Sequence, residues 1–204
     1  MIEELNKKYN IILASGSPRR KELLQRAGYQ FEVITANVDE SFSPGTLAND
    51  LVITLSQKKA NAVADKIEDE KALIIAADTI VAIENEILGK PYNLEEAKHL
   101  LFYLSNKKNH RVITGVCIKL GNEIITFSAT TEVVLNKISL PEIEYYCNNY
   151  EVLDKAGAYG IQDWIGLNKI KALTGCYYNV MGLPISLLYV KLEELINTKN
   201  STLT

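Results

Sequence analysis

Two serines, a glycine, a proline and two arginines follow one another near the N-terminus, and together they have the chemistry of an anion-binding site. Residues 13–20 read Leu-Ala-Ser-Gly-Ser-Pro-Arg-Arg. Ser17 is a good N-cap, and Pro18 fits the first helical position, where a missing N–H costs nothing. Arg19 and Arg20 then fall in the first turn, which the helix dipole makes unfavourable for cations. Free N–H groups, hydroxyls and guanidinium groups suit a phosphate or polyphosphate, whereas a solvated, capped surface helix is the alternative.

A carboxylate interrupts a strongly apolar run in the first half of the chain. Asp78 follows Leu73-Ile-Ile-Ala-Ala77, where the sequence predicts a short buried strand that is cut at Asp78-Thr79 and resumes at 80–83. Burying an unpaired charge is costly, so a carboxylate in this position is usually paired, hydrogen-bonded or bound to a metal. A structural cap at the strand end is the alternative. Thr79 could add a hydroxyl to the same site.

Two further segments supply polar groups that could meet a ligand. Gly89-Lys90-Pro91 places a lysine in a rigid turn, where its ammonium could act on a phosphate, although an exposed turn lysine is the commoner explanation. Residues 153–162 contain glycines and small alanines that let the backbone approach a ligand closely, and they end at Gln162. Its amide complements the O4 and N3–H edge of uracil or thymine, or cytosine when flipped. A solvated glutamine in a tight turn is the alternative.

The composition and the scarce histidines exclude several other classes of function. The 204 residues are 47% hydrophobic and 23% charged, and a net charge of −3 argues against broad nucleic-acid binding. His99 and His110 are too few for a histidine-built zinc site, and no P-loop spacing occurs. Three widely spaced cysteines predict free thiols, and no apolar stretch approaches a membrane span. We therefore expect a cytoplasmic protein with neither a nucleic-acid nor a membrane partner.

The order of the predicted elements indicates one α/β domain over residues 1–204. Early strands and helices alternate, a hairpin on Gly121-Asn122 sits in the middle, and no linker divides the chain, so we expect a mixed sheet flanked by helices, with two lobes around a central cleft. The predicted elements are strands at 11–13, 31–35, 73–77, 80–83, 111–120 and 123–135, a loop at 37–45, helices at 18–28, 46–66, from 93, 139–146 and 185–196, a strand and turn at 175–184, and a polar tail at 197–204.

Taken in order, these segments resemble the Maf family of nucleoside triphosphate pyrophosphatases. The motifs that support the resemblance are Ala14-Ser-Gly-Ser-Pro-Arg-Arg20, Val38-Asp-Glu40, Lys59-Ala60, Ala77-Asp-Thr-Ile-Val81, Leu88-Gly-Lys-Pro91, Asp154-Lys-Ala-Gly-Ala-Tyr-Gly-Ile-Gln162 and Val180-Met-Gly-Leu-Pro184. They span nearly the whole chain. The resemblance implies a Maf/ITPase-like fold with a nucleotide cleft, metal-dependent hydrolysis of a nucleoside triphosphate to the monophosphate and pyrophosphate, and a homodimer.

The resemblance also implies roles for particular residues of this chain. Asp78 matches the family's proposed proton acceptor, and Arg19, Thr79 and Gln162 match positions associated with substrate choice. Other polar residues of the family's pocket are matched by Ser15, Arg20, Glu40, Lys59 and Lys90. The threonine after the aspartate, with Gly-Ile-Gln, looks like the branch that hydrolyses dTTP and UTP, and modified pyrimidine triphosphates are further candidates. One departure is Asp163-Trp164, where the family usually continues with glycine.

Oxygen ligands and positive charge agree with that reading of the residues. Carboxylates such as Asp78 and Glu40 suit Mg²⁺ or Mn²⁺, and four cationic side chains can balance a triphosphate. Asp78 could bind the metal, take the proton from water, or do both. The competing hypothesis is a nucleotide-binding regulator that uses the same pocket but restrains cell division through a protein partner.

Overall fold

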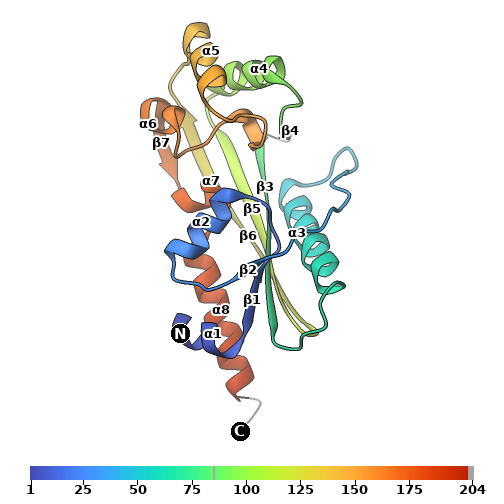
Figure 1. Ribbon diagram of the computed structural model, residues 1–204. Coiled ribbons are helices and arrows are strands. Elements are labelled where there is room, and N and C mark those ends of the chain that lie inside the picture. The colour runs from blue at the N-terminus through green and yellow to red at the C-terminus, as the bar shows by residue number, and fades with distance from the viewer. Residues whose placement is uncertain (85, 202–204) are drawn as a thin grey trace.

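A seven-stranded mixed sheet forms the centre of the molecule. The computed structural model describes residues 1–84 and 86–201 (Figure 1). The strands follow the order β2-β1-β3-β5-β6-β7, with β4 also paired to β3. Their bounds are Asn10–Leu13 (β1), Glu32–Val33 (β2), Ala72–Ile83 (β3), Glu86–Leu88 (β4), His110–Leu120 (β5), Glu123–Leu135 (β6) and Ile170–Thr174 (β7). β1 runs parallel to β2 and β3, whereas the other pairs are antiparallel, so the predicted mixed sheet is confirmed.

Helices cover both faces of this sheet. They are Ile2–Lys8 (α1), Pro18–Arg26 (α2), Ala48–Ala64 (α3), Leu94–Ser105 (α4), Leu140–Asn149 (α5), Trp164–Lys169 (α6), Tyr177–Met181 (α7) and Ile185–Ser201 (α8), with a 3₁₀ turn at Ala156–Ala158 (η1). α3 lies on one side, α2 and α8 lie on the other, and α4 and α5 gather at one end (Figure 1). Among the described residues, no helix is long and apolar enough to cross a membrane.

The long strand β3 corrects the expectation that Asp78-Thr79 break a strand. Both residues stay inside β3, because β5 continues the antiparallel pairing through them, with Asp78 opposite Gly115 and Thr79 opposite Thr114. What ends here is the neighbouring strand. β1 pairs with β3 only as far as Leu13 and Ile75, and β4 pairs again from Val81 onward. The edge of β3 is therefore open between the ends of β1 and β4, beside Asp78 and Thr79.

The alternation of β3 sends its two polar residues to opposite faces. Leu73, Ile75 and Ala77 belong to a core cluster shared with α2 and α8. The intervening Ile74 and Ala76 pack in a second cluster, which contains residues of α3. Since successive side chains of a strand point in opposite directions, Asp78 lies on the α3 face and Thr79 lies on the α2 face.

Gly115 allows α3 to lie directly on the sheet beside Asp78. A Cβ atom at Gly115 would lie 2.4 Å from the backbone carbonyl of Val52 in α3. That separation is far shorter than a van der Waals contact, so only glycine permits this approach of helix and strand. The same helix also provides Lys59, whose side chain reaches Asp78.

The core divides along β3 in the manner expected of two lobes. Residues near the start of β3 pack with α2 and α8, as described above. Val81 and Ile83, near its end, pack in another cluster with residues of α4 and α5. Asp78 and Thr79 lie between these two clusters. The predicted two-lobed α/β architecture with a mixed sheet is confirmed.

Local signals predicted several element ends correctly. Asn93 caps α4 by accepting from the backbone N–H of Glu96 at 2.9 Å. Ser139 and Glu142 form a capping box at the start of the predicted helix 139–146, and α5 runs on to Asn149. Gly121-Asn122 joins β5 to β6 as a hairpin. All of these signals act within a few residues, which is why the sequence alone reveals them.

Other segments differ from the expectations. The segment 175–184 contains the helix α7, not a strand, and α1, α6 and β7 were not predicted. The predicted strand at 31–35 is reduced to Glu32–Val33. α8 continues to Ser201, so most of the expected polar tail is helical, and 202–204 lie outside the described residues. The short elements in this group depend on packing against the sheet more than on a periodic sequence pattern.

Candidate functional site

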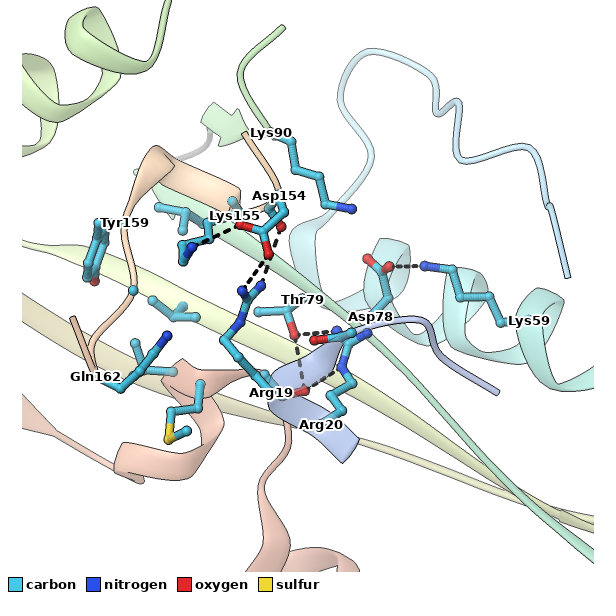
Figure 2. Close-up of a pocket in the computed structure, with 18 residues that line it drawn as sticks. Arg19, Arg20, Lys59, Asp78, Thr79, Lys90, Asp154, Lys155, Tyr159 and Gln162 are labelled. Carbon is cyan, nitrogen blue, oxygen red and sulfur yellow. Dashed lines mark hydrogen bonds and ion pairs between the residues drawn. The ribbon is translucent and has the colours of Figure 1, made fainter. Parts of the chain in front are cut away.

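The residues singled out from the sequence converge on one cleft at the open edge of β3. Its inner part is lined by Arg19, Arg20, Lys59, Asp78, Thr79, Lys90 and Gln162 (Figure 2). Ser15 and Glu40 line an adjoining hollow. Arg19, Arg20, Lys59 and Lys90 border both parts. The fold thereby brings together side chains from α2, α3 and β3 and from the loops around residues 15, 40, 90 and 160.

Lys59 joins the two carboxylates that the sequence suggested as metal ligands. Its ammonium contacts Asp78 Oδ1 and lies 2.7 Å from Glu40 Oε1. Asp78 is 8% exposed, so its charge is paired within the fold and not left alone in an apolar strand. Burial raises the pKa of Glu40, but hydrogen bonding to Lys59 and the charges of Lys59, Lys90 and Arg20 outweigh it and bring the pKa below its ordinary value.

Arg20 is built into the wall of the cleft. Its Nε donates to the backbone carbonyl of Gly182 at 2.8 Å, Nη1 to Ser15 Oγ at 2.9 Å, and Nη2 to Thr79 Oγ1 at 2.9 Å. Burial lowers the pKa of Arg20, and the nearby charge of Asp78 opposes that shift. A guanidinium group has five N–H donors. Two therefore remain for a ligand, while three hold the side chain in place.

Arg19 is held differently, by a carboxylate across the mouth of the cleft. Its Nη1 lies 2.7 Å from Asp154 Oδ2, and the other Asp154 oxygen lies 2.9 Å from Lys155 Nζ (Figure 2). Burial raises the pKa of Asp154, but hydrogen bonds from Lys155 and Arg19 outweigh it, so the pKa lies below its ordinary value. Asp154 and Lys155 were not recognised as site residues from the sequence. Arg19 and Asp154 are 135 positions apart, so no spacing signal connects them.

Gln162 ends the glycine-rich loop with an acceptor that has no partner in the described part of the chain. Its Oε1 is buried and accepts no hydrogen bond there. A buried polar atom of this kind normally has a partner, and Gln162 lines the cleft, so a ligand there could supply the missing donor. A Cβ atom at Gly160 would lie 2.7 Å from Gln162 Nε2, so that glycine leaves the amide its space.

The unusual Asp163-Trp164 pair anchors the same loop to α5. Asp163 Oδ2 accepts from the hydroxyl of Tyr146 at 3.0 Å, and that hydroxyl accepts from the backbone N–H of Gly160 at 3.0 Å. Trp164 begins α6 and contacts Tyr145 edge to face. The departure from the family pattern is therefore accommodated by contacts that fix the backbone next to Gln162.

A buried histidine contacts Tyr159, which lies in the same loop as Gln162. His110 Nε2 lies 2.7 Å from the hydroxyl of Tyr159, which lines the cleft. Burial lowers the pKa of His110 to about 4, so the ring is neutral near pH 7.

The carboxylates fit a metal that is shared with a ligand. Among residues 1–84 and 86–201, no group of three or more His, Cys, Asp or Glu side chains is arranged to hold a metal. Asp78 and Glu40 do contact one ammonium, so their oxygens already share a single cation. Mg²⁺ is commonly bound by one or two carboxylates together with phosphate oxygens and water. The donor set thus fits Mg²⁺ or Mn²⁺ once a polyphosphate supplies further oxygens.

Comparisons with known proteins agree with the motifs. The family model described as Maf-like protein matches residues 10–195. A dTTP/UTP pyrophosphatase of Phocaeicola vulgatus is 45% identical over 196 residues, which cover 96% of this chain and 100% of the relative. One of Cytophaga hutchinsonii is 47% identical over 188 residues, or 92% of this chain and 85% of the relative. Among solved structures, the Staphylococcus aureus Ham1 protein aligns with a TM-score of 0.45 and 16% identity, over 62% of this chain and 71% of that one.

Proposed function

Because this chain belongs to the Maf family, we propose that it hydrolyses dTTP and UTP to the nucleoside monophosphate and pyrophosphate. Modified pyrimidine triphosphates are further candidate substrates. The relatives that carry the name dTTP/UTP pyrophosphatase align with nearly all of this chain. The observation on which the proposal depends is the joint pairing of Asp78 and Glu40 with Lys59 in a cleft that also holds Arg19, Arg20 and Lys90.

The cationic side chains suit the triphosphate part of such a substrate. Lys59 and Lys90 lie on the same side of the cleft as Asp78 (Figure 2), and both also border the adjoining hollow that Glu40 lines. Arg19 can exchange Asp154 for a phosphate oxygen, since both acceptors are anionic and Asp154 is partly open to solvent. Arg20 has two donors left after its bonds to the protein. Phosphoryl transfer depends mainly on positioning and on neutralising charge, and these four side chains supply both.

In this proposal Asp78 is the general base. Lys59 engages Oδ1, which leaves Oδ2 to accept a proton from the attacking water. The ion pair also limits the rotation of the carboxylate, so the base stays aimed at the cleft. Lys59 then lies close enough to donate to a phosphate oxygen while it still contacts Asp78.

A divalent cation completes the proposed site. Asp78 and Glu40 would hold Mg²⁺ or Mn²⁺ together with phosphate oxygens. When bound, the ion supplies charge neutralisation and polarises the phosphoanhydride. Glu40 reaches this position from the loop before α3 and is half exposed, so it can move from Lys59 to a cation.

The nucleobase of the substrate is assigned to the Gln162 end of the cleft. The unpartnered Oε1 can accept the N3–H of uracil or thymine, and Nε2 can donate to O4. Purines are larger and present a different donor pattern at this edge. We therefore expect pyrimidine triphosphates to be preferred.

The direct test is a nucleotide panel with Mg²⁺, Mn²⁺ or a chelator. We expect release of pyrophosphate and a monophosphate, highest with dTTP and UTP and abolished by the chelator. Release of single orthophosphates would instead identify a phosphatase. Glu40→Gln should raise the Mg²⁺ concentration needed for half-maximal rate, whereas the matched variant Asp39→Asn, which removes a carboxylate bonded to Ser41, should not.

We also propose that the protein acts in the cytoplasm as a homodimer, without a nucleic-acid or membrane partner. Cys117, Cys147 and Cys176 are all free thiols, which suits a reducing compartment. The net charge of −3 disfavours broad nucleic-acid binding. Light scattering coupled to size exclusion tests the assembly, and a mass close to 22.8 kDa would contradict the dimer.

A further inference from the structure

A chain of hydrogen bonds leads from the cleft into the core behind Thr79. Arg20 Nη2 donates to Thr79 Oγ1 at 2.9 Å, within the cleft (Figure 2). Thr79 Oγ1 lies 2.9 Å from Thr114 Oγ1, on the paired position of β5. Thr114 Oγ1 then donates to the backbone carbonyl of Asn179 at 3.1 Å. Thr114 is 0% exposed, so a ligand in the cleft can meet Thr79 but not Thr114.

This series of hydrogen bonds ends at the backbone carbonyl of Asn179, in α7, which is held firmly in place. Asn179 is 0% exposed, and its Nδ2 donates to the carbonyl of Val112 at 3.0 Å and to Thr131 Oγ1 at 2.9 Å. Thr131 Oγ1 also exchanges hydrogen bonds with the backbone of Cys176. These contacts tie α7 to β5 and β6. The carbonyl that faces Thr114 therefore has a fixed position.

Each threonine hydroxyl has only one hydrogen, and this decides which of the two hydroxyls donates to the other. Thr114 directs its hydrogen to Asn179, so Thr79 must be the donor in its contact with Thr114. The other acceptor within reach of Thr79 is the Gly182 carbonyl, which is 3.4 Å away and already accepts from Arg20 Nε at 2.8 Å. The contact with Thr114 is the shorter one and its acceptor is not shared with Arg20, so the Thr79 hydrogen goes to Thr114 and points into the protein. One lone pair of Thr79 then remains free.

We propose that Thr114 is a positioning residue that makes Thr79 a hydrogen-bond acceptor toward the substrate. The inference rests on the proposed function and deepens it. One lone pair of Thr79 accepts from Arg20, and the other accepts a sugar O–H of the nucleoside, because the N3–H of the base is assigned to Gln162. A phosphate oxygen has no hydrogen to offer, so it is disfavoured there. Thr79 thus selects the nucleoside end of the substrate and leaves the phosphates to Lys59 and Lys90.

Thr114→Val tests this role, because it keeps the shape of the side chain and removes the hydroxyl. We expect kcat/KM for UTP to fall about threefold to tenfold, mainly through KM, since one net hydrogen bond is lost. Inhibition by inorganic tripolyphosphate, which has no nucleoside, should stay unchanged. Thr114→Ser keeps the hydroxyl and should restore the KM for UTP. Equal weakening of UTP and tripolyphosphate, or no recovery in the serine variant at unchanged Tm, would overturn the inference.

A second variant covers the case in which Thr114→Val does not fold. Thr79→Val removes the accepting hydroxyl directly and should raise the KM for UTP without changing inhibition by tripolyphosphate. Where both single variants fold, the double variant should be no weaker than Thr79→Val alone, because Thr114 acts only through Thr79. Additive losses would contradict the proposed relay. Absence of nucleotide hydrolysis in the wild type would instead reject the function, so the two failures are distinguishable.

Two substrate analogues identify the donor. N3-methyl-UTP lacks the base N–H, and 3′-deoxy-UTP lacks one sugar hydroxyl. 3′-Deoxy-UTP, which lacks the sugar donor, should bind less well to the wild type and should lose nothing further in Thr114→Val. If both analogues lose as much in the variant as UTP does, Thr79 does not accept from either group and the assignment to the nucleoside is wrong.

Discussion

Asp78 and Thr79 are neighbours in β3, yet they belong to two different environments. On the α3 face, Asp78 and Glu40 meet Lys59 through charged contacts, and Glu40 is half exposed. On the opposite face, Thr79 joins Arg20 and Thr114 in a network that continues into the core. Charged pairs near solvent can exchange partners for a ligand, whereas buried hydroxyls keep their partners. One strand can therefore supply both a reactive wall and a rigid wall of a cleft.

The largest effect is expected on the Asp78 face. Asp78→Asn keeps the size of the side chain but removes its charge and basicity, so kcat should fall by about 10²–10⁴. Steady-state release of pyrophosphate measures the loss, and thermal unfolding checks that the variant is folded, since Lys59 keeps Glu40 as its partner. A rate within a few-fold of the wild type would remove Asp78 from the role of base. A cellular effect that survives in this inactive variant would support the alternative role as a regulator.

A substitution at Gly115 should disturb the wall of the cleft that contains Asp78, because α3 packs against Gly115. Gly115→Ala would force a Cβ against the backbone of Val52 and push α3, with Lys59, away from Asp78. We expect destabilisation of about 3 kcal/mol, because the helix backbone cannot yield easily. Chemical denaturation measures it. Gly89→Ala is the matched control, since nothing lies within 4 Å of a Cβ there. Equal stability of the two variants would contradict the close packing of α3 against Gly115.

Loss of Arg19 should affect every nucleoside triphosphate alike. Arg19→Ala removes a guanidinium group that can exchange Asp154 for phosphate, and a charged hydrogen bond of this kind contributes about 1.5–3 kcal/mol. The measurement is kcat/KM across all four bases. A loss confined to uracil and thymine would place Arg19 at the base and would contradict its assignment to the phosphates.

The smallest and most selective effect is expected at Gln162. Gln162→Glu keeps the size but, when ionised, offers only acceptors, so it should repel O4 of uracil or thymine. The expected loss in kcat/KM is about 1–3 kcal/mol for those bases alone. The other nucleotides of the same panel are the internal control. Equal losses for all bases would leave Gln162 as part of a structural turn.

Short-range chemistry explains which elements the sequence revealed. The cap at Asn93 and the box at Ser139 act within one turn of helix, and Gly121-Asn122 acts within one hairpin, so neighbouring residues are sufficient. The helix α7 and the strand β7 lack a comparable local signal. They form where the chain packs against β5 and β6, and α7 is held by Asn179.

The residue types of the cleft and the order of its motifs can be read along the chain. Which of these residues meet depends on how the strands and helices pack. Asp78 looked like the end of a strand, because a charge inside an apolar run is costly, but β5 pairs through it and Lys59 balances it. Arg19 finds Asp154 across 135 positions. Contacts of this kind depend on where β1 stops along β3, and no spacing along the chain encodes that geometry.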